Sequence, residues 1–175
     1  MKILKISLLI AFVIFSGFVR DSQTGKTDTG VVVPMKFWGV ILPDDAGGLI
    51  PCDPVWAGIN HRRFGFLQGH QTHGGELIKE QSTWEIISCS TDLATGLNTS
   101  QVVGVNTVSN GDTYTWVCTM LINISALDVI LNVTVTAGTG RFEGATGEIN
   151  MSGTMTGHGI PCYGEGFLSF PKKDQ

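Results

Sequence analysis

Positive charge is scarce in this sequence, and it does not cluster. The 175 residues hold 11 lysines and arginines against 15 aspartates and glutamates, which gives a formal net charge of −4 at pH 7. Electrostatic attraction to phosphates supplies most non-specific affinity for nucleic acids, so an acidic chain without a basic cluster predicts no nucleic-acid partner. The length leaves room for one domain, and a hydrophobic content of 42% indicates that this domain is globular.

Several chemical motifs are also missing. The chain contains no Gly-x-Ser-x-Gly, no His-Glu-x-x-His and no Cys-x-x-Cys, the spacings that would indicate a hydrolase nucleophile, a metalloprotease or a structural zinc site. Its carboxylates form no obvious pair for acid–base chemistry. The sequence therefore predicts no catalytic residue and no cofactor. It favours a protein without enzymatic activity and leaves that question open.

Histidines are the remaining candidates for metal chemistry, because imidazole is a common metal ligand. His61, His70, His73 and His158 would form a site if they met at one mouth of the domain. The closest pair, His70 and His73, adjoins a Gly-Gly turn with no acidic residue between them. This pattern is typical of exposed loop histidines, so no metal site is predicted.

The first 20 residues have the order of a secretory signal peptide. Lys2 and Lys5 precede an apolar run, and small residues follow it. A retained N-terminal anchor is the alternative, because the apolar stretch 3–19 reaches the lower limit for crossing a bilayer. Either reading predicts a secreted, periplasmic or cell-surface protein with no membrane span in its mature domain. Residues 21–33 are expected to form a flexible leader.

From residue 34 onwards apolar and polar residues alternate, which predicts strands, and helical spacing never lasts beyond a turn. The clearest example is 113–124, and Asn110-Gly111-Asp112 before it is a hairpin signal, because Asn and Gly tolerate the positive φ of primed turns. A loop is expected at 43–58. The predicted strands are 35–42, 61–69, 76–89, 101–108, 113–124, 129–136, 148–156 and 164–170.

About eight sequential strands, each with one apolar face, must stack as two sheets or close on themselves, since an open sheet leaves exposed edges. We predict closure into an all-β, antiparallel up-and-down β-barrel of the calycin-like kind, without substantial helix after the N-terminal signal. The barrel domain is expected to span residues 34–171, followed by a polar tail at 172–175.

A glycine-rich decapeptide, Gly-Thr-Gly-Arg-Phe-Glu-Gly-Ala-Thr-Gly, occupies residues 138–147, after an alternating strand and the turn at 110–112. This combination resembles the allene oxide cyclase-like and dirigent-like β-barrels, and it is most similar to small secreted bacterial proteins of that group without an assigned activity. The resemblance covers roughly residues 34–170. It implies an eight-stranded barrel that holds lipid- or phenol-derived small molecules, and it carries over no catalytic residue.

From its residues alone the decapeptide is expected to be a compact structural corner between two strands rather than a ligand site. Its glycines supply backbone freedom, and Arg141 and Glu143 can reach neighbouring carbonyls and amides. The motif residues, with the preceding turn, are Asn110, Gly111, Gly138, Gly140, Arg141, Phe142, Gly144 and Gly147.

Six large side chains are expected to point into the barrel lumen. Pockets for small molecules are lined mainly by such groups, although an eight-stranded barrel is just wide enough either to be packed solid or to hold one small ligand. We predict non-catalytic binding of a small apolar or amphipathic molecule. The alternatives are an isomerase or cyclase, and a structural or surface-interaction barrel with a filled core. The lumen candidates are Trp84, Tyr114, Trp116, Met120, Met151 and Met155.

Three aliphatic residues with outward parity, Val117, Leu121 and Ile130, either form an apolar patch for an oligomer or belong to the ordinary surface.

Four cysteines allow two disulfides in three possible pairings if the domain reaches an oxidising compartment. Cys89 and Cys118 would be separated by the strand at 101–108, and two strand spacings of about 9 to 10 Å exceed the ~7 Å limit between bonded Cα atoms. In a closed barrel the end of the first strand lies beside the start of the last strand. The expected bond therefore joins Cys52 to Cys162. Such a bond would stabilise the fold, because it would close a long loop.

Overall fold

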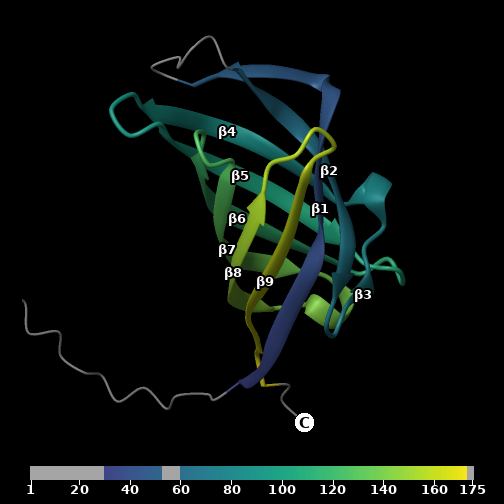
Figure 1. Ribbon diagram of the computed structural model, residues 1–175. Coiled ribbons are helices and arrows are strands. Elements are labelled where there is room, and N and C mark those ends of the chain that lie inside the picture. The colour runs from purple at the N-terminus through teal and green to yellow at the C-terminus, as the bar shows by residue number, and fades with distance from the viewer. Residues whose placement is uncertain (1–29, 53–59, 173–175) are drawn as a thin grey trace, which may run out of the picture.

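The strands of this protein pair edge to edge in a closed ring (Figure 1). The computed structural model describes residues 30–52 and 60–172. Every pairing is antiparallel, β1 closes the ring by pairing with both β9 and β2, and ring neighbours follow chain order. The predicted all-β up-and-down barrel is therefore confirmed. In ring order the strands are β1 (Val31–Pro51), β9 (Ile160–Phe170), β8 (Thr146–Thr154), β7 (Asp128–Gly138), β6 (Thr113–Asn123), β5 (Leu97–Thr107), β4 (Thr83–Asp92) and β2 (Asn60–Gln71).

Within the described residues, three short elements lie outside this ring. The two-residue strand β3 (Gly75–Glu76) pairs with the end of β2. Two 3-10 helices, η1 (Lys79–Gln81) and η2 (Gly140–Phe142), lie in the connections that follow β3 and β7. No helix in the described part of the chain is both long enough and apolar enough to cross a membrane.

Alternation along the strands sorts the side chains between lumen and surface. In β6 the side chains of Tyr114, Trp116 and Cys118 are buried, whereas Val117 between them is 45% exposed. The same period of two runs through β7, where every second residue from Val129 to Val135 is buried. Because side chains alternate across a strand, closing the sheet places one apolar set inside. The core of the molecule is thus the barrel lumen.

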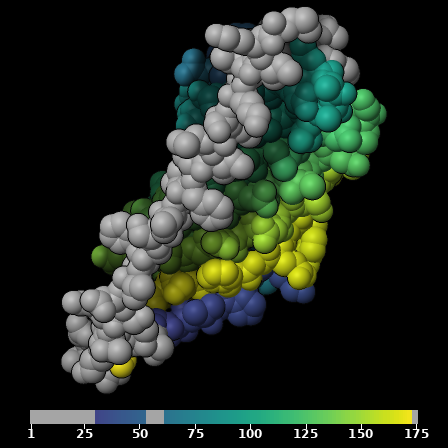
Figure 2. Space-filling model, turned by 90° about the vertical axis from the view of Figure 1, so that its left-hand side faces the viewer, coloured from purple at the N-terminus to yellow at the C-terminus, as the bar shows by residue number. Residues whose placement is uncertain are grey.

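The N-terminal and C-terminal strands lie side by side, as the purple and yellow strands show in Figure 2. β1 pairs with β9 from Val31 opposite Phe170 to Ile41 opposite Ile160. The weakest seam is between β2 and β4, whose ladder covers only Phe64–Phe66 against Thr83–Glu85. By contrast, the β5–β6 ladder covers both strands from end to end.

Several element boundaries differ from the sequence prediction. β1 begins at Val31, so Val31–Val33 belong to the barrel and not to the leader predicted at 21–33. It also continues to Pro51 through a register shift between Asp44 and Leu49, where a loop was predicted. Pro43 is tolerated there because β1 has already passed the end of β9, so its missing N–H falls on an unpaired edge. Residues 1–20, predicted as the signal peptide, lie outside the described residues.

The predicted strand at 76–89 is also wrong as a single element. Its first part forms β3 and η1, and β4 begins only at Thr83. Ser82, which is fully buried, explains the break, because its hydroxyl accepts a hydrogen bond from the amide of Thr107. That bond fixes the chain at the point where it turns back into the ring.

The predicted disulfide is wrong as well. Cys52 is bonded to Cys89, with 4.8 Å between their Cα atoms, whereas Cys162 is a free, buried thiol. The seam between the first and last strands was placed correctly, since Cys162 lies opposite Gly39 of β1. Cys52, however, is carried far beyond this point, because β1 continues past its bulge and ends beside β4.

Candidate functional site

The lumen has two ends that differ in construction, and both are needed to describe the site. The closed end is formed by the β5–β6 turn at 108–112, the β7–β8 connection at 139–145 and the loop at 72–74 after β2. It lies at the bottom of Figure 1. The open end is formed by the far ends of β1 and β2 and by the β8–β9 turn at 155–159.

An apolar cavity of about 50 Å³, here called the deep cavity, lies in the lumen on the side of the closed end. One water molecule needs roughly 10–15 Å³, so this space is larger than a packing defect. Asn106 and Tyr114 are among the lining residues, but the surface of the cavity is almost entirely apolar. Five of the six predicted lumen residues line this cavity: Trp84, Tyr114, Trp116, Met120 and Met151.

A second cavity of about 190 Å³, here called the mouth cavity, adjoins the first at the open end. Trp84 and Met120 line both spaces, so the two cavities adjoin each other. Met155, the sixth predicted lumen residue, lines the mouth cavity. The structure therefore brings all six candidates together around these two adjoining cavities of the lumen.

The mouth cavity is bordered by the polar residues that the deep cavity lacks. Arg62 lines it and pairs with Asp45, their atoms Nη2 and Oδ1 lying 2.6 Å apart. His61 lines it too, and burial lowers the pKa of its imidazole. Because a histidine with a lowered pKa is neutral at pH 7, Arg62 is the positively charged group of this lining.

Four side chains form a hydrogen-bonded chain at the closed end of the lumen. The indole Nε1 of Trp116 donates to Asn106 Oδ1 at 2.9 Å. Asn106 Nδ2 donates to the Tyr114 hydroxyl at 2.6 Å, and that hydroxyl in turn donates to Gln71 Oε1. Gln71 is fully buried, and its Nε2 atom has no hydrogen-bond partner among the described residues. This network is the polar part of an otherwise apolar site.

The network is electrically neutral. Burial raises the pKa of Tyr114 far above its ordinary value, and the hydrogen bonds from Asn106 and to Gln71 oppose that shift only partly. Loss of solvent disfavours the charged phenolate, so the hydroxyl keeps its proton. The side chains at the closed end of the lumen thus form hydrogen bonds but carry no charge.

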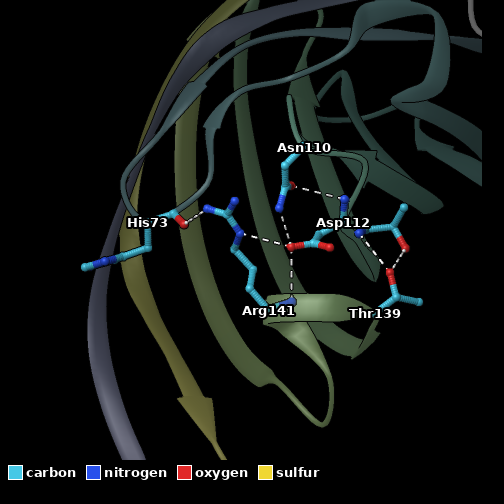
Figure 3. Close-up of polar contacts among 6 residues, drawn as sticks. His73, Asn110, Asp112, Thr139 and Arg141 are labelled. Atoms are coloured by element: carbon cyan, nitrogen blue, oxygen red, sulfur yellow. Dashed lines mark hydrogen bonds and ion pairs between the residues drawn. The ribbon is translucent and has the colours of Figure 1, made fainter.

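Phe142 of the decapeptide plugs the closed end. Its buried ring meets that of Tyr114 edge to face, with 5.1 Å between the ring centroids. Arg141 beside it is exposed and joins the three loops of the closed end (Figure 3). Its Nε atom donates to Asp112 Oδ2 at 3.1 Å, and its Nη1 atom donates to the carbonyl of His73 at 3.1 Å.

Asp112 is the centre of this closed-end clamp. Its Oδ2 atom accepts hydrogen bonds from Asn110 Nδ2 at 2.7 Å and from the backbone amide of Arg141 at 3.1 Å, in addition to the Arg141 side chain (Figure 3). These bonds hold the pKa of the Asp112 carboxyl below its usual range, the bond from Asn110 having the largest effect. A Thr139 hydroxyl bonded to the Thr113 amide extends the clamp.

The glycines of the predicted motif fit this arrangement. Gly140 has a φ of 56°, and a Cβ atom there would overlap the Asp112 carboxylate. Gly138 ends β7 where Phe142 crosses it, so a Cβ atom would overlap the Phe142 backbone. Gly111 and Gly144 have positive φ in the two turns, and Gly147 lies within β8. The contacts of Arg141 and the plug formed by Phe142 make the decapeptide a structural corner.

The four histidines do not meet at one mouth. His61 lines the mouth cavity and His158 lies in the β8–β9 turn at the same end. His70 instead stacks on the indole of Trp38, with 4.6 Å between the ring centroids, and His73 lies at the closed end, where its carbonyl accepts from Arg141. Among the residues that the structure describes, no three His, Cys, Asp or Glu side chains gather as metal ligands.

Two cysteines in the lumen wall are unpaired thiols. Burial raises the pKa of Cys118 and of Cys162 to about 12, so both stay protonated at neutral pH and are poor nucleophiles.

Sequence reasoning missed Asn106, Gln71 and Asp112. Asn106 lies on the inward parity of a strand that was predicted, and a polar residue at such a position was the available signal. Gln71 carried none, because the predicted strand ended at residue 69. Asp112 was named only as part of the hairpin signal, since its bond to Arg141 spans 29 residues.

Comparison with protein-family models and with curated proteins finds no match to this chain.

Proposed function

We propose that this protein is an exported β-barrel of the allene oxide cyclase-like and dirigent-like kind that binds one small, uncharged, apolar or amphipathic molecule in its lumen without transforming it. The observation that carries the proposal is the deep cavity itself, an apolar space that adjoins the mouth cavity and has Asn106 and Tyr114 of the neutral network in its lining. Small-molecule sites combine mostly apolar walls with a few placed polar groups in this way.

The network supports a ligand with one polar end. Asn106 Nδ2 uses one hydrogen on Tyr114, so an oxygen of the ligand that reaches Asn106 would have the second hydrogen as its donor. Because Tyr114 keeps its proton, burial of a charged ligand group beside it would have no counter-charge and would cost several kcal/mol. A hydroxyl or carbonyl oxygen on an apolar body fits these conditions.

The cavity volumes support a slender ligand. An apolar cavity of about 150 Å³ binds benzene in an engineered protein, so the deep cavity, at about 50 Å³, accepts less than one ring without adjustment. The mouth cavity adds about 190 Å³. Met120, Met151 and Met155 line these spaces, and unbranched methionine side chains adapt readily to a ligand's shape.

The Cys52–Cys89 disulfide supports export, because such bonds persist mainly in oxidising compartments. The order of residues 1–20, positive and then apolar, supports it independently.

Isomerisation or cyclisation is the second candidate function, and the position of the Tyr114 hydroxyl favours it. A neutral phenol and a carboxamide at the end of an apolar lumen can orient a reactive molecule and polarise an oxygen on it. Binding without turnover remains the first proposal because the one ionisable group of the deep-cavity lining, Tyr114, has a pKa far from neutrality.

The test is a fluorescence titration with N-phenyl-1-naphthylamine, an uncharged apolar probe. We expect saturable binding to the wild type. Met155→Trp narrows the mouth and should weaken binding about tenfold or more. The matched control is Val117→Trp, which adds the same side chain to the outer surface, where Val117 is 45% exposed, and should bind like the wild type.

No uptake by the wild type would overturn the proposal in favour of a filled structural barrel. Equal weakening in both variants would place the probe on the outer surface. Recovery of a chemically altered compound, after incubation with an unsaturated epoxide or a phenoxy substrate, would favour the isomerase.

A further inference from the structure

Three lumen residues lie flat against the barrel wall, each over a glycine of the neighbouring strand. The indole of Trp116 covers Gly104 of β5, where a Cβ atom would overlap Cζ2 and lie 2.5 Å from Cε2. The indole of Trp84 covers Gly65 of β2, with Cζ2 at 2.6 Å from such a Cβ atom, which would also overlap the backbone oxygen of Leu42. Since carbon atoms in contact are separated by about 3.5–4.0 Å, neither ring position tolerates a methyl group beneath it.

The glycines lie directly opposite the residues that cover them. Gly104 is the register partner of Trp116 and also of Trp84, and Gly65 is the partner of Trp84. Both indoles therefore lean in the same direction around the ring, from β6 towards β5 and from β4 towards β2. Glycine weakens a strand interior and often marks a close approach, so its repetition opposite large lumen residues is a feature of the wall.

Hydrogen bonds hold both indoles in this position. Trp116 Nε1 donates to Asn106, which is two residues beyond Gly104 on the same strand. Trp84 Nε1 donates to the carbonyl of Phe66, the residue after Gly65, at 3.2 Å. An indole that swung into the lumen would lose its partner, and an unpaired buried donor is costly. The hydrogen bond at Nε1 thus holds each indole in its position against the wall.

Met151 repeats the arrangement on the opposite side of the ring. It is the register partner of Gly164 in β9, and a Cβ atom on Gly164 would overlap its Cγ atom and lie 2.9 Å from its Cβ atom. Met151, Trp84 and Trp116 all line the deep cavity. Without the glycines, these three side chains would project towards the barrel axis and fill it.

We propose that Gly65, Gly104 and Gly164 are the specificity-determining residues of the lumen: by letting Trp84, Trp116 and Met151 lie along the wall, they keep an axial channel open for a slender, uncharged ligand. The part of this inference that concerns the ligand rests on the proposed binding function. The part that concerns the open channel does not, and the two have separate probes.

The experiment measures xenon binding by ¹²⁹Xe NMR and N-phenyl-1-naphthylamine binding by fluorescence, in the wild type and in Gly104→Ala. Xenon enters small apolar cavities, so it reports the channel itself. We expect Gly104→Ala to displace Trp116, to shift the indole N–H resonance, and to weaken binding of both probes about tenfold or more. The control is Gly157→Ala, in the β8–β9 turn, where a Cβ atom meets nothing within 4 Å.

A second variant separates channel closure from misfolding. In Gly104→Ala/Trp116→Leu the shorter leucine no longer reaches over residue 104, so xenon binding should return to the wild-type level or exceed it. Failure of the double variant to recover binding, while it unfolds cooperatively, would overturn the inference. Gly164→Ala tests the other wall and is expected to weaken xenon binding through Met151.

The outcomes distinguish the inference from the proposed function. Xenon binding to the wild type that is lost in Gly104→Ala supports the channel even if the naphthylamine never binds, a result that would end the proposed function. Xenon binding that is equal in both proteins overturns the inference, while uptake of the naphthylamine would still support ligand binding. Absence of xenon binding to the wild type overturns the open channel.

Discussion

The two ends of the barrel are held together by different means. At the closed end, the Asp112 carboxylate and Arg141 tie three loops with hydrogen bonds, and Phe142 fills the space beneath. At the open end the β2–β4 ladder stops at Phe64 and Glu85, and the Cys52–Cys89 bond joins β1 to β4 beyond that point. The closed end is thus filled by an aromatic ring and held by hydrogen bonds, whereas the open end is held by a disulfide at its rim.

This difference shows how a small barrel can open without falling apart. A ladder that continued along β2 and β4 would draw those strands together over the mouth cavity. A covalent bond resists separation of the strands while leaving the space between them free, because it acts at one point. The closed end needs no such bond, since its loops are short and bury an aromatic plug.

Removal of the disulfide is the strongest test of this division. Its 37-residue separation corresponds to about 4 kcal/mol in the chain-entropy model. Cys52→Ala/Cys89→Ala should therefore lower the free energy of unfolding by about that amount in a urea titration. The deep cavity of this variant should remain, because it lies on the side of the closed end. The control is Cys118→Ala, which removes a buried thiol but no bond and should cost about 1 kcal/mol. Equal unfolding midpoints for the wild type and the double variant would show that the open end does not depend on the staple.

The disulfide also shows where sequence reasoning fails. Strand order follows from alternation and turn residues, which are local, so the ring and its β1–β9 seam were predictable. The position of Cys52 depends on how far β1 continues past Pro43, and prolines normally end strands. The bulge between Asp44 and Leu49 depends on tertiary pairing, which the local sequence does not encode.

A change at Gly140 tests the clamp of the closed end. Gly140→Ala places a methyl group on the Asp112 carboxylate and forces an alanine into a positive φ of 56°. Strain of this kind costs about 1–3 kcal/mol, so we expect a loss of about 2 kcal/mol in thermal unfolding. Gly157→Ala, with open space around it and an ordinary φ, should cost less than about 0.5 kcal/mol. A Gly140→Ala protein as stable as the control would refute the role of Asp112 as the centre of the clamp.

The candidate site was predictable to a similar extent. Five of the six lumen residues lie on strands whose parity is visible in the sequence, Met155 directly follows β8, and all six line the two cavities. What makes the site polar was not predictable, because Gln71 meets Tyr114 across 43 residues. Contacts between side chains so far apart in the sequence depend on how the ring closes. Alternation alone does not predict the register of the strands that closure brings together.

The smallest expected effect compares two aspartates, one at each end, through their pH dependence. The Asp112 carboxyl accepts hydrogen bonds from Asn110 and Arg141, which lie in two different loops, and its pKa falls below the ordinary 3.8. Asp92, the last residue of β4 at the open end, also has a lowered pKa, but its hydrogen bonds come from Thr95 and Ala94 of the β4–β5 turn that follows it. Only the bonds of Asp112 therefore connect separate parts of the fold.

A carboxyl with a lowered folded pKa stabilises the protein above its unfolded value and loses that contribution as the pH falls through the folded value. Asp112→Asn should thus lower the melting temperature at pH 7, and the difference from the wild type should shrink as the pH falls below 3.8. Asp92→Asn should show the same trend with a smaller difference at pH 7, because its turn can loosen without freeing a neighbouring loop. Circular dichroism melts at low salt, at pH 7 and at a pH below 3.8, measure these differences in melting temperature. A larger loss of melting temperature in Asp92→Asn than in Asp112→Asn would contradict the prediction that the closed end depends more on its carboxylate than the open end does.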